Sequence, residues 1–187
     1  TSALIRMQGK YTGVASQDGL YLNNRLVTKG NCTRWEDGER LLINLSVEAA
    51  IFENSARNIL SDGLSYDRCR IGIVTDMPDT AHLGEFYVHN ADQIRKVIRT
   101  QVDVVLPDGA AVLNADDAAV AELAELCDGD VILYAHSGEL NAIREHRAGG
   151  KRAVFIKDGM IVLANAETET ALIAVQSLPR SEERRVG

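Results

Sequence analysis

Cysteine is scarce in this sequence, and its spacing fits neither a metal site nor a disulfide scaffold. The three cysteines are an odd number, and no two of them form a CxxC pair: Cys32, Cys69 and Cys127. A disulfide framework needs paired cysteines, and a zinc site needs clustered ones. We therefore expect neither, and we expect the protein to work in a reducing cytoplasm.

Long apolar runs and a basic surface are also missing. No stretch approaches the roughly eighteen apolar residues of a membrane-spanning helix, and the chain does not start with the basic-then-apolar pattern of an export signal. The formal net charge is -7, and we find no concentrated basic face of the kind that nucleic-acid phosphates require. These absences predict no membrane insertion and no nucleic-acid partner. Any bound anion must then be held by backbone amides, single cations or metal ions.

The apolar content is sufficient for a folded core. The chain has 187 residues, of which 45% are hydrophobic, and it contains no repeat, low-complexity segment or linker, so one domain is expected. Apolar runs of strand length alternate with helical patterns, which predicts an α/β fold with a mainly parallel sheet flanked by helices. Expected strands lie at 11–16, 46–53, 70–75, 110–115 and 130–135, and a pair of strands is expected within 153–164.

Local turn residues add detail to this pattern. Asn23-Asn24 and Asp158-Gly159 are typical of tight hairpin turns, because these residues tolerate a positive φ. Helices are expected over 55–64 and 91–105, and Pro107-Asp108-Gly109 is expected to turn the chain into the next strand. Small β-hairpin additions to the sheet are therefore predicted.

Both ends of the chain are unusual for a natural protein. The first residue is not Met, and TSALIRMQGK starts in the middle of a helical pattern. The last eight residues, RSEERRVG, resemble the translation of a sequencing-library adapter. We therefore expect residues 1–179 to be the natural part and 180–187 to be a non-native tail that packs against nothing. A charged, solvated natural tail is the alternative.

Polar residues gather where three predicted strands end. Glu53 follows AAIF, residues 76–82 follow IGIVT, and residues 114–117 follow AAVL. Open α/β sheets bind ligands at the carboxyl ends of their strands, so we expect these strands to be neighbours that share one ligand site. Simpler interpretations stay open. Asp116 or Asp117 could cap the next helix, and His82 could be an ordinary loop residue.

Longer motifs resemble one family of ligases. The segments LVTKGNCT and GLSYDRC, and the stretch from HRAGG to MIVLA, resemble the muramyl-ligase-like domain of the cyanophycin synthetases. The NADD box at 114–117 is shared more widely, with many amide ligases of the muramyl ligase superfamily. The resemblance extends from about residue 3 to Pro179. It implies a muramyl-ligase-like central domain with a P-loop NTPase fold.

The resemblance implies an ATP-dependent amide ligase. ATP would phosphorylate an aspartate β-carboxylate, and the α-amine of arginine would attack the acyl phosphate, so that arginine joins an aspartate-containing polymer primer. ATP and Mg2+ are the implied cofactors, because metal ions must bridge the oxygens of the transferred phosphoryl group. The full-length enzyme is expected to be cytoplasmic and to form a homo-oligomer.

The resemblance also implies roles for single residues. Glu53 matches a strand-end acid that binds the magnesium ion of ATP, and His82 matches a histidine near a second magnesium. Asn114 matches the residue that reads the adenine edge, because an amide both donates and accepts. Asp116 and Asp117 would bind the ribose or cap the following helix. No catalytic acid or base is implied.

The sequence departs from the family at several points. The glycine-rich phosphate loop with its Lys-Thr pair is absent and would lie before Thr1, so this piece alone is expected to be inactive. Residues 54–58 stand where many relatives have an arginine and a glycine pair, and Ala81 replaces an acid. Two alternatives therefore stay open: another muramyl-ligase-type amide ligase, and a catalytically dead scaffold or polymer-binding domain of a related synthetase.

Overall fold

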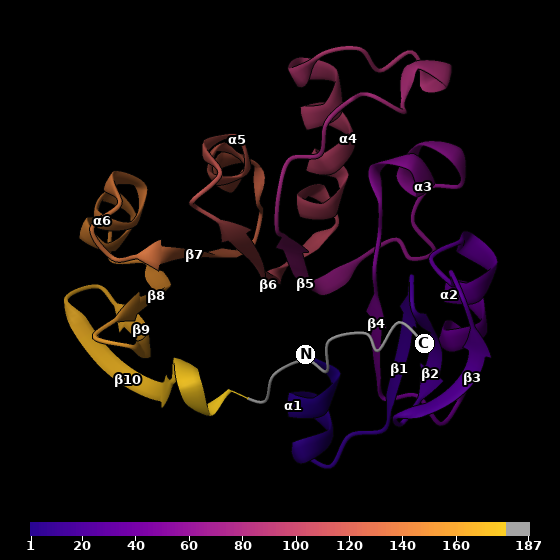
Figure 1. Cartoon of the computed structure of the whole chain (residues 1–187), viewed down its shortest axis with the longest axis horizontal. Helices are drawn as coiled ribbons and strands as arrows, with labels where there is room; N and C mark the ends of the chain where they lie inside the picture. The colour runs from indigo at the N-terminus through magenta and orange to yellow at the C-terminus, as the bar shows by residue number, and fades with distance from the viewer. Residues whose placement is uncertain (179–187) are drawn as a thin grey trace. The chain divides into compact units, whose positions relative to one another are not determined.

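The computed structural model describes residues 1–178, which form two compact units (Figure 1). The first unit combines Thr1–Asp67 with Pro78–Val97, and the second combines Arg68–Met77 with the chain from Ile98 onward. The predicted tail at 180–187 lies outside the described residues. Across residues 1–178, no helix is both long and apolar enough to cross a lipid bilayer.

The sheet of the first unit has four strands in the order β3-β2-β1-β4. The hairpins β1–β2 and β2–β3 are antiparallel, whereas β4 runs parallel to β1. The predicted turn between β2 and β3 is confirmed, since Asn23 and Asn24 have φ values of 45° and 75°. The strand bounds are Thr12–Ser16 for β1, Gly19–Leu22 for β2, Arg25–Lys29 for β3 and Ala49–Phe52 for β4.

Helix α2 covers this sheet, and sequence reasoning did not predict it. It packs on β1 and β4, and its Leu41 joins Ala15, Leu20 and Cys32 in the core of the first unit. A Cβ on its Gly38 would lie 2.0 Å from the Ser65 hydroxyl, so the close approach requires glycine there. The other helices of this unit are α1 (Ser2–Met7) and α3 (Ala56–Ser61), with the 3-10 turn η1 (Gly84–Phe86); α2 itself spans Trp35–Leu42.

The second unit contains a six-stranded sheet in the order β10-β9-β8-β7-β6-β5. Strands β5 to β8 are parallel, and β9 and β10 extend the sheet in antiparallel fashion. The predicted hairpin at Asp158-Gly159 is confirmed by φ values of 50° and 72°. The bounds are Cys69–Val74 for β5, Val105–Asn114 for β6, Asp130–Ser137 for β7, Arg152–Lys157 for β8, Met160–Asn165 for β9 and Thr168–Ala174 for β10.

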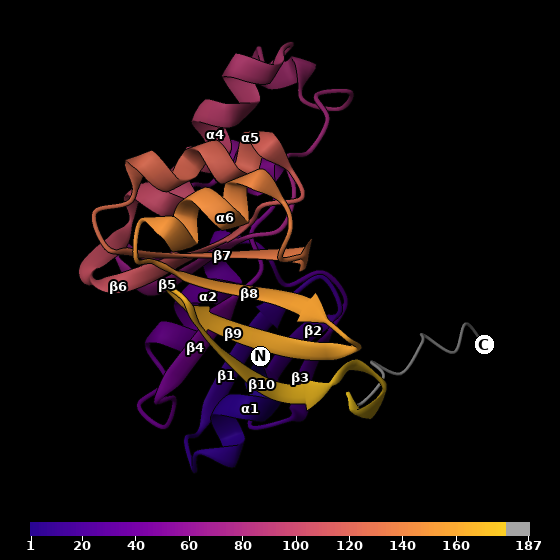
Figure 2. The ribbon, with the colours of Figure 1, turned by 90° about the vertical axis from the view of Figure 1, so that its left-hand side faces the viewer.

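Helices α5 and α6 pack on the same face of this sheet (Figure 2). Between the helices and the sheet lies an apolar core that includes Leu113, Val120, Leu123, Ile143 and Phe155, each 2% exposed or less. The α/β fold predicted from the sequence is therefore confirmed, although both sheets are mixed. The helical bounds are Ala91–Asp103 for α4, Ala118–Ala121 for α5, Glu122–Leu126 for η2, Asn141–Ala148 for α6 and Val175–Ser177 for η3.

Two expectations about the strands were wrong. The strand before Glu53, β4, pairs with β1 in the first unit's sheet and is not a neighbour of β5 or β6. Its apolar run indicates a buried strand, but a run of this kind does not specify its pairing partner. The predicted turn at residues 107–109 lies inside β6, where the pairing with β5 shifts between Val105 and Ala110. By contrast, β5 and β6 are neighbours, as predicted.

Candidate functional site

Three parallel strands of the second unit end at one edge of its sheet, and polar residues follow each of them. Val74 of β5 lies opposite Leu113 of β6, and Asn114 lies opposite Tyr134 of β7. The carboxyl ends of parallel strands are the usual ligand edge of an open α/β sheet. We refer to Thr75, Asp76, Asn114, Asp116, Asp117, Tyr134 and His136 as the carboxyl-edge cluster.

The Asn114 amide connects two of these strand ends. Its Nδ2 donates to the carbonyl oxygen of Thr75 at 2.8 Å, and its Oδ1 accepts from the backbone N–H of Asp116 at 3.1 Å. These two bonds fix the orientation of the amide. One N–H and one oxygen lone pair remain for a ligand, which is the donor and acceptor pair that an adenine edge needs. The predicted adenine contact is thus compatible with this geometry and stays a prediction.

The structure places Asp117 in a capping position. Its Oδ1 accepts from the backbone N–H groups of Ala119 at 3.0 Å and Val120 at 3.4 Å, at the start of α5. Its Oδ2 accepts from the N–H of Met77 at 2.9 Å, in the segment after β5. The capping interpretation is therefore confirmed for this residue. Because both oxygens already hold backbone groups, Asp117 is poorly placed to hold a ribose as well.

Asp116 faces a histidine that sequence reasoning missed. Its Oδ2 accepts from the backbone N–H of His136 at 2.9 Å and lies 2.6 Å from the ring Nδ1 of the same residue. The strand DVILYA was expected to end at Ala135, whereas β7 continues to Ser137. The rule that identified Asn114, a polar residue at a strand's carboxyl end, would have identified His136 had β7 been extended by two residues.

Negative charge dominates the carboxyl-edge cluster. Partial burial raises the pKa of the Tyr134 phenol, and the nearby charges of Asp76 and Asp116 raise it further. The phenol therefore stays protonated and can donate a hydrogen bond. Uncompensated phosphate groups would be repelled by the same carboxylates. The edge is thus better suited to the neutral base and sugar of a nucleotide than to its phosphates.

Glu53 lies at the carboxyl end of β4 in the first unit. Its backbone N–H donates to Ala15 at 2.9 Å, and its Oε2 accepts from the N–H of Gln17 at 2.8 Å, so the residue joins the ends of β1 and β4. The side chain is exposed, and no described residue bonds the other carboxylate oxygen. An exposed carboxylate oxygen at a strand end is a ligand type that fits Mg2+.

His82 lies in an exposed loop of the same unit. The loop is attached to α3, the helix that follows Glu53, because Arg57 pairs with Glu85 and stacks 5.6 Å from the ring centre of Phe86. Within residues 1–178, no three His, Cys, Asp or Glu side chains gather as a metal site. Magnesium usually keeps several waters and takes few protein ligands, so Glu53 fits such an ion. The metal role of His82 stays a prediction.

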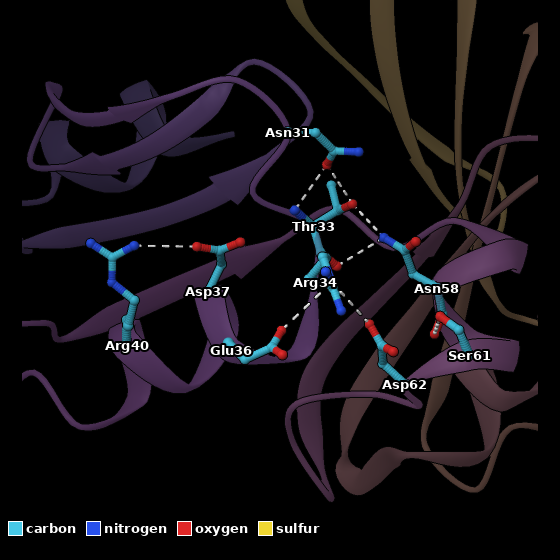
Figure 3. A network of polar contacts seen from close by, with 9 residues as sticks. All are labelled: Asn31, Thr33, Arg34, Glu36, Asp37, Arg40, Asn58, Ser61 and Asp62. Carbon is cyan, nitrogen blue, oxygen red and sulfur yellow. Dashed lines mark hydrogen bonds and ion pairs between the residues drawn. The ribbon is translucent and has the colours of Figure 1, made fainter.

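The segment that departs from the family is held by specific hydrogen bonds (Figure 3). Asn31 Oδ1 accepts from the backbone N–H of Thr33 at 3.1 Å and from its hydroxyl at 2.7 Å. Asn58 Nδ2 donates to the Thr33 carbonyl at 3.0 Å and to the Thr33 hydroxyl. Ser55 caps α3 by accepting from the N–H of Asn58 at 3.2 Å. Side-chain hydrogen bonds of Asn58 and Ser55 therefore order this segment.

Comparison with known proteins connects this geometry to a family. No family model matches the sequence. Cyanophycin synthetases match most of it: 36% identity over 83% of the chain for Crocosphaera subtropica, 32% over 88% for Synechocystis sp. and 31% over 94% for Geminocystis herdmanii. The chain is homologous to a segment of the cyanophycin synthetases. It spans 18%, 19% and 20% of the length of these relatives, respectively.

The fold agrees with this homology. A crystal structure of MurF from Acinetobacter baumannii superposes with a TM-score of 0.52 over 92% of this chain and 33% of that one. The sequence identity is 15%, so the likeness concerns the fold alone. The resemblance to muramyl-ligase-like cyanophycin synthetases that the motifs indicated is confirmed by these comparisons.

Proposed function

We propose that this chain is part of an ATP-dependent amide ligase that joins arginine to an aspartate β-carboxylate during cyanophycin synthesis. The observation that carries the proposal is the carboxyl-edge cluster, found in a chain homologous to cyanophycin synthetases. Two partners are implied, arginine and an aspartate-containing primer, and the full-length enzyme would be a cytoplasmic homo-oligomer.

Each site residue takes a role that its local geometry permits. Asn114 offers its remaining N–H and lone pair to the adenine edge, and Asp116 faces the sugar. Glu53 supplies an anionic oxygen to a magnesium ion, and His82 lies near a second one. ATP would supply the phosphoryl group that activates the aspartate carboxylate. The protein would orient ATP and the two amino-acid substrates, and it would offset the negative charge of the phosphates.

A scaffold without activity is the second candidate, favoured by one specific observation. Asn58 donates to the carbonyl oxygen and the hydroxyl of Thr33, within the segment at 54–58 that departs from the family pattern. If that region must admit substrate phosphates, a bonded side chain there would obstruct them. The same domain would then bind the polymer without adding to it.

The role of Asn114 is tested in a parent enzyme of the relatives' length. Asn114→Ala is expected to raise the KM for ATP in arginine-dependent turnover by about 5- to 150-fold, since roughly 1–3 kcal/mol of base recognition is lost. The expected change in kcat is smaller, because the amide is remote from the reacting carboxylate. Ser137→Ala is the matched control at the end of the adjacent strand. An unchanged KM for Asn114→Ala would contradict the adenine role.

A further inference from the structure

Strand β3 is an open edge of the first unit's sheet. It stands at the end of the order β3-β2-β1-β4, and within residues 1–178 its only strand partner is β2. Figure 1 shows β3 at the margin of this sheet. An open edge presents backbone N–H and C=O groups without a partner strand, and an extended peptide can add to them as a further strand. The outer edge of β3 is therefore a candidate binding surface.

The charge of this edge is opposite to that of the whole protein. The formal net charge is -7, yet residues 19–35 contain three cations and no acidic residue. Arg34 already bridges two acidic side chains. Arg25 and Lys29, at the two ends of β3, are exposed, and within residues 1–178 neither forms an ion pair. Both cations thus remain available to an anionic partner.

The two cations lie on opposite faces of the sheet. Directly paired residues of antiparallel strands share a face, and Arg25 pairs with Leu22 whereas Lys29 pairs with Gly19. Positions 19 and 22 of β2 point to opposite faces, because side chains alternate along a strand. A register shift in the pairing of β2 with β3 produces this arrangement. An added strand also alternates its side chains, so a peptide with successive carboxylates would meet a cation on each face.

The residues between the cations are apolar. Leu26 and Val27 are 46% and 47% exposed. Exposed apolar residues favour strand addition, whereas cations on an edge can also protect it against pairing with another copy. The two effects differ in the partner, because a cationic edge repels a second cationic edge and attracts an anionic chain. The outer strands β4 and β10 contain no cation and offer no such attraction.

We propose that β3 binds an extended, aspartate-rich peptide as an added strand, with carboxylates at Arg25 and Lys29. Backbone hydrogen bonds supply affinity in this mode of binding, and the cations select an anionic chain. The inference rests on the proposed function, since the aspartate-containing primer offers a peptide backbone with carboxylate groups. Lys29 belongs to LVTKGNCT, one of the segments that resemble the cyanophycin synthetases.

The test is an NMR titration of the 187-residue chain with an end-capped peptide of about eight aspartates, enough to span β3. The amide signals of residues 25–29 are expected to shift. Arg25→Gln and Lys29→Gln should each weaken binding by about 2- to 5-fold, the size of one exposed ion pair. Lys10→Gln is the matched control, since it removes an exposed cation outside β3 and should leave binding unchanged.

A second probe tests the backbone contribution. A peptide of the same charge that is methylated at every backbone nitrogen has no N–H donors, so it cannot pair as a strand. It should bind at least about tenfold more weakly than the unmodified peptide. Equal binding of the two peptides would show a purely electrostatic contact and would overturn strand addition. Signal shifts confined to residues outside 25–29 would overturn the proposal as well.

A purely protective role of the cations has its own outcome. It predicts that the peptide does not bind, and that a double variant with Arg25→Gln and Lys29→Gln self-associates in light scattering, which would overturn the proposal. The titration measures binding without turnover, so its failure would leave arginine addition by the parent enzyme unaffected. A parent enzyme without arginine-dependent phosphate release would overturn the proposed function alone, because binding of the anionic peptide to β3 is measured separately.

Discussion

Single side chains organise the carboxyl edge of the six-stranded sheet. Asp117 bonds three backbone N–H groups from two segments, and Asn114 bonds one carbonyl and one N–H. Both residues thus hold the loop after β5 against the turn after β6. Asp116 is more exposed, and within residues 1–178 its side chain bonds His136 alone. The two aspartates should therefore differ in their contributions to stability and to ligand binding.

The first prediction compares these aspartates. Asp117→Ala should lower the free energy of unfolding by about 1–3 kcal/mol, because it removes a helix cap and charge-assisted bonds to the backbone. Asp116→Ala should cost less than about 1 kcal/mol, since its side chain is more exposed. Urea denaturation of both variants measures the difference. Equal losses of unfolding free energy in the two variants would show that the helix cap at Asp117 is not the main stabilising interaction of the two aspartates.

The second prediction concerns pH. Burial lowers the pKa of His146 from 6.5, and Nε2 of the ring bonds the carbonyl of Val131 at 3.1 Å. The folded protein therefore binds a proton less readily than the unfolded chain, so stability falls as the pH drops below that unfolded value and levels off above it. Denaturation between about pH 5 and pH 8 should show this slope. His146→Gln should flatten the dependence of stability on pH. An equally steep slope in this variant would show that another group causes the pH dependence.

At the scale of elements, the loop after β3 and helix α3 form one ordered assembly. Asn58 is the main connection, because its amide donates to the carbonyl oxygen and the hydroxyl of Thr33, a residue that is 8% exposed. A hydrogen bond to a buried polar group stabilises the fold more than a hydrogen bond between exposed groups, because its loss leaves the buried group without a partner.

The third prediction tests that connection. Asn58→Ala should lower the free energy of unfolding by about 1–3 kcal/mol and speed amide hydrogen exchange in residues 31–34, because the Thr33 carbonyl loses its donor. Ser61→Ala, on the same helix, removes only a 3.4 Å bond from an exposed hydroxyl and serves as the control. Similar exchange rates in both variants would contradict the connecting role of Asn58.

Sequence was informative where the signal was local. The Asn23-Asn24 and Asp158-Gly159 turns and the cap at Asp117 depend on residues a few positions apart, and sequence reasoning found them. Helix α2 was missed because its Gly38 is unfavourable in a helix interior and is explained only by contact with Ser65. Two features depend on tertiary pairing, which the local pattern does not encode. One is the choice of sheet for β4, and the other is the pairing of Asp116 with His136.

At the scale of the whole molecule, the chain resembles a segment of larger proteins both in sequence and in fold. The chain matches about a fifth of the length of several cyanophycin synthetases, and a MurF structure shares its fold. Residues with proposed roles occur in both units. Glu53 ends a strand of the first unit, and the carboxyl-edge cluster belongs to the second. Arginine addition is the central claim that follows.

The most direct test of that claim is amino-acid-dependent phosphate release by a parent enzyme on a short primer. Glu53→Ala should abolish the arginine-dependent release, because the loss of an anionic oxygen leaves the magnesium ion and the γ-phosphate poorly positioned. Aspartate-dependent release, which we propose to occur at a different ATP site of the parent enzyme, should persist in the same variant. Glu139→Ala, which alters an exposed glutamate, should retain both activities. If Glu53→Ala leaves the arginine-dependent rate unchanged, this domain does not add arginine, and the scaffold function replaces it.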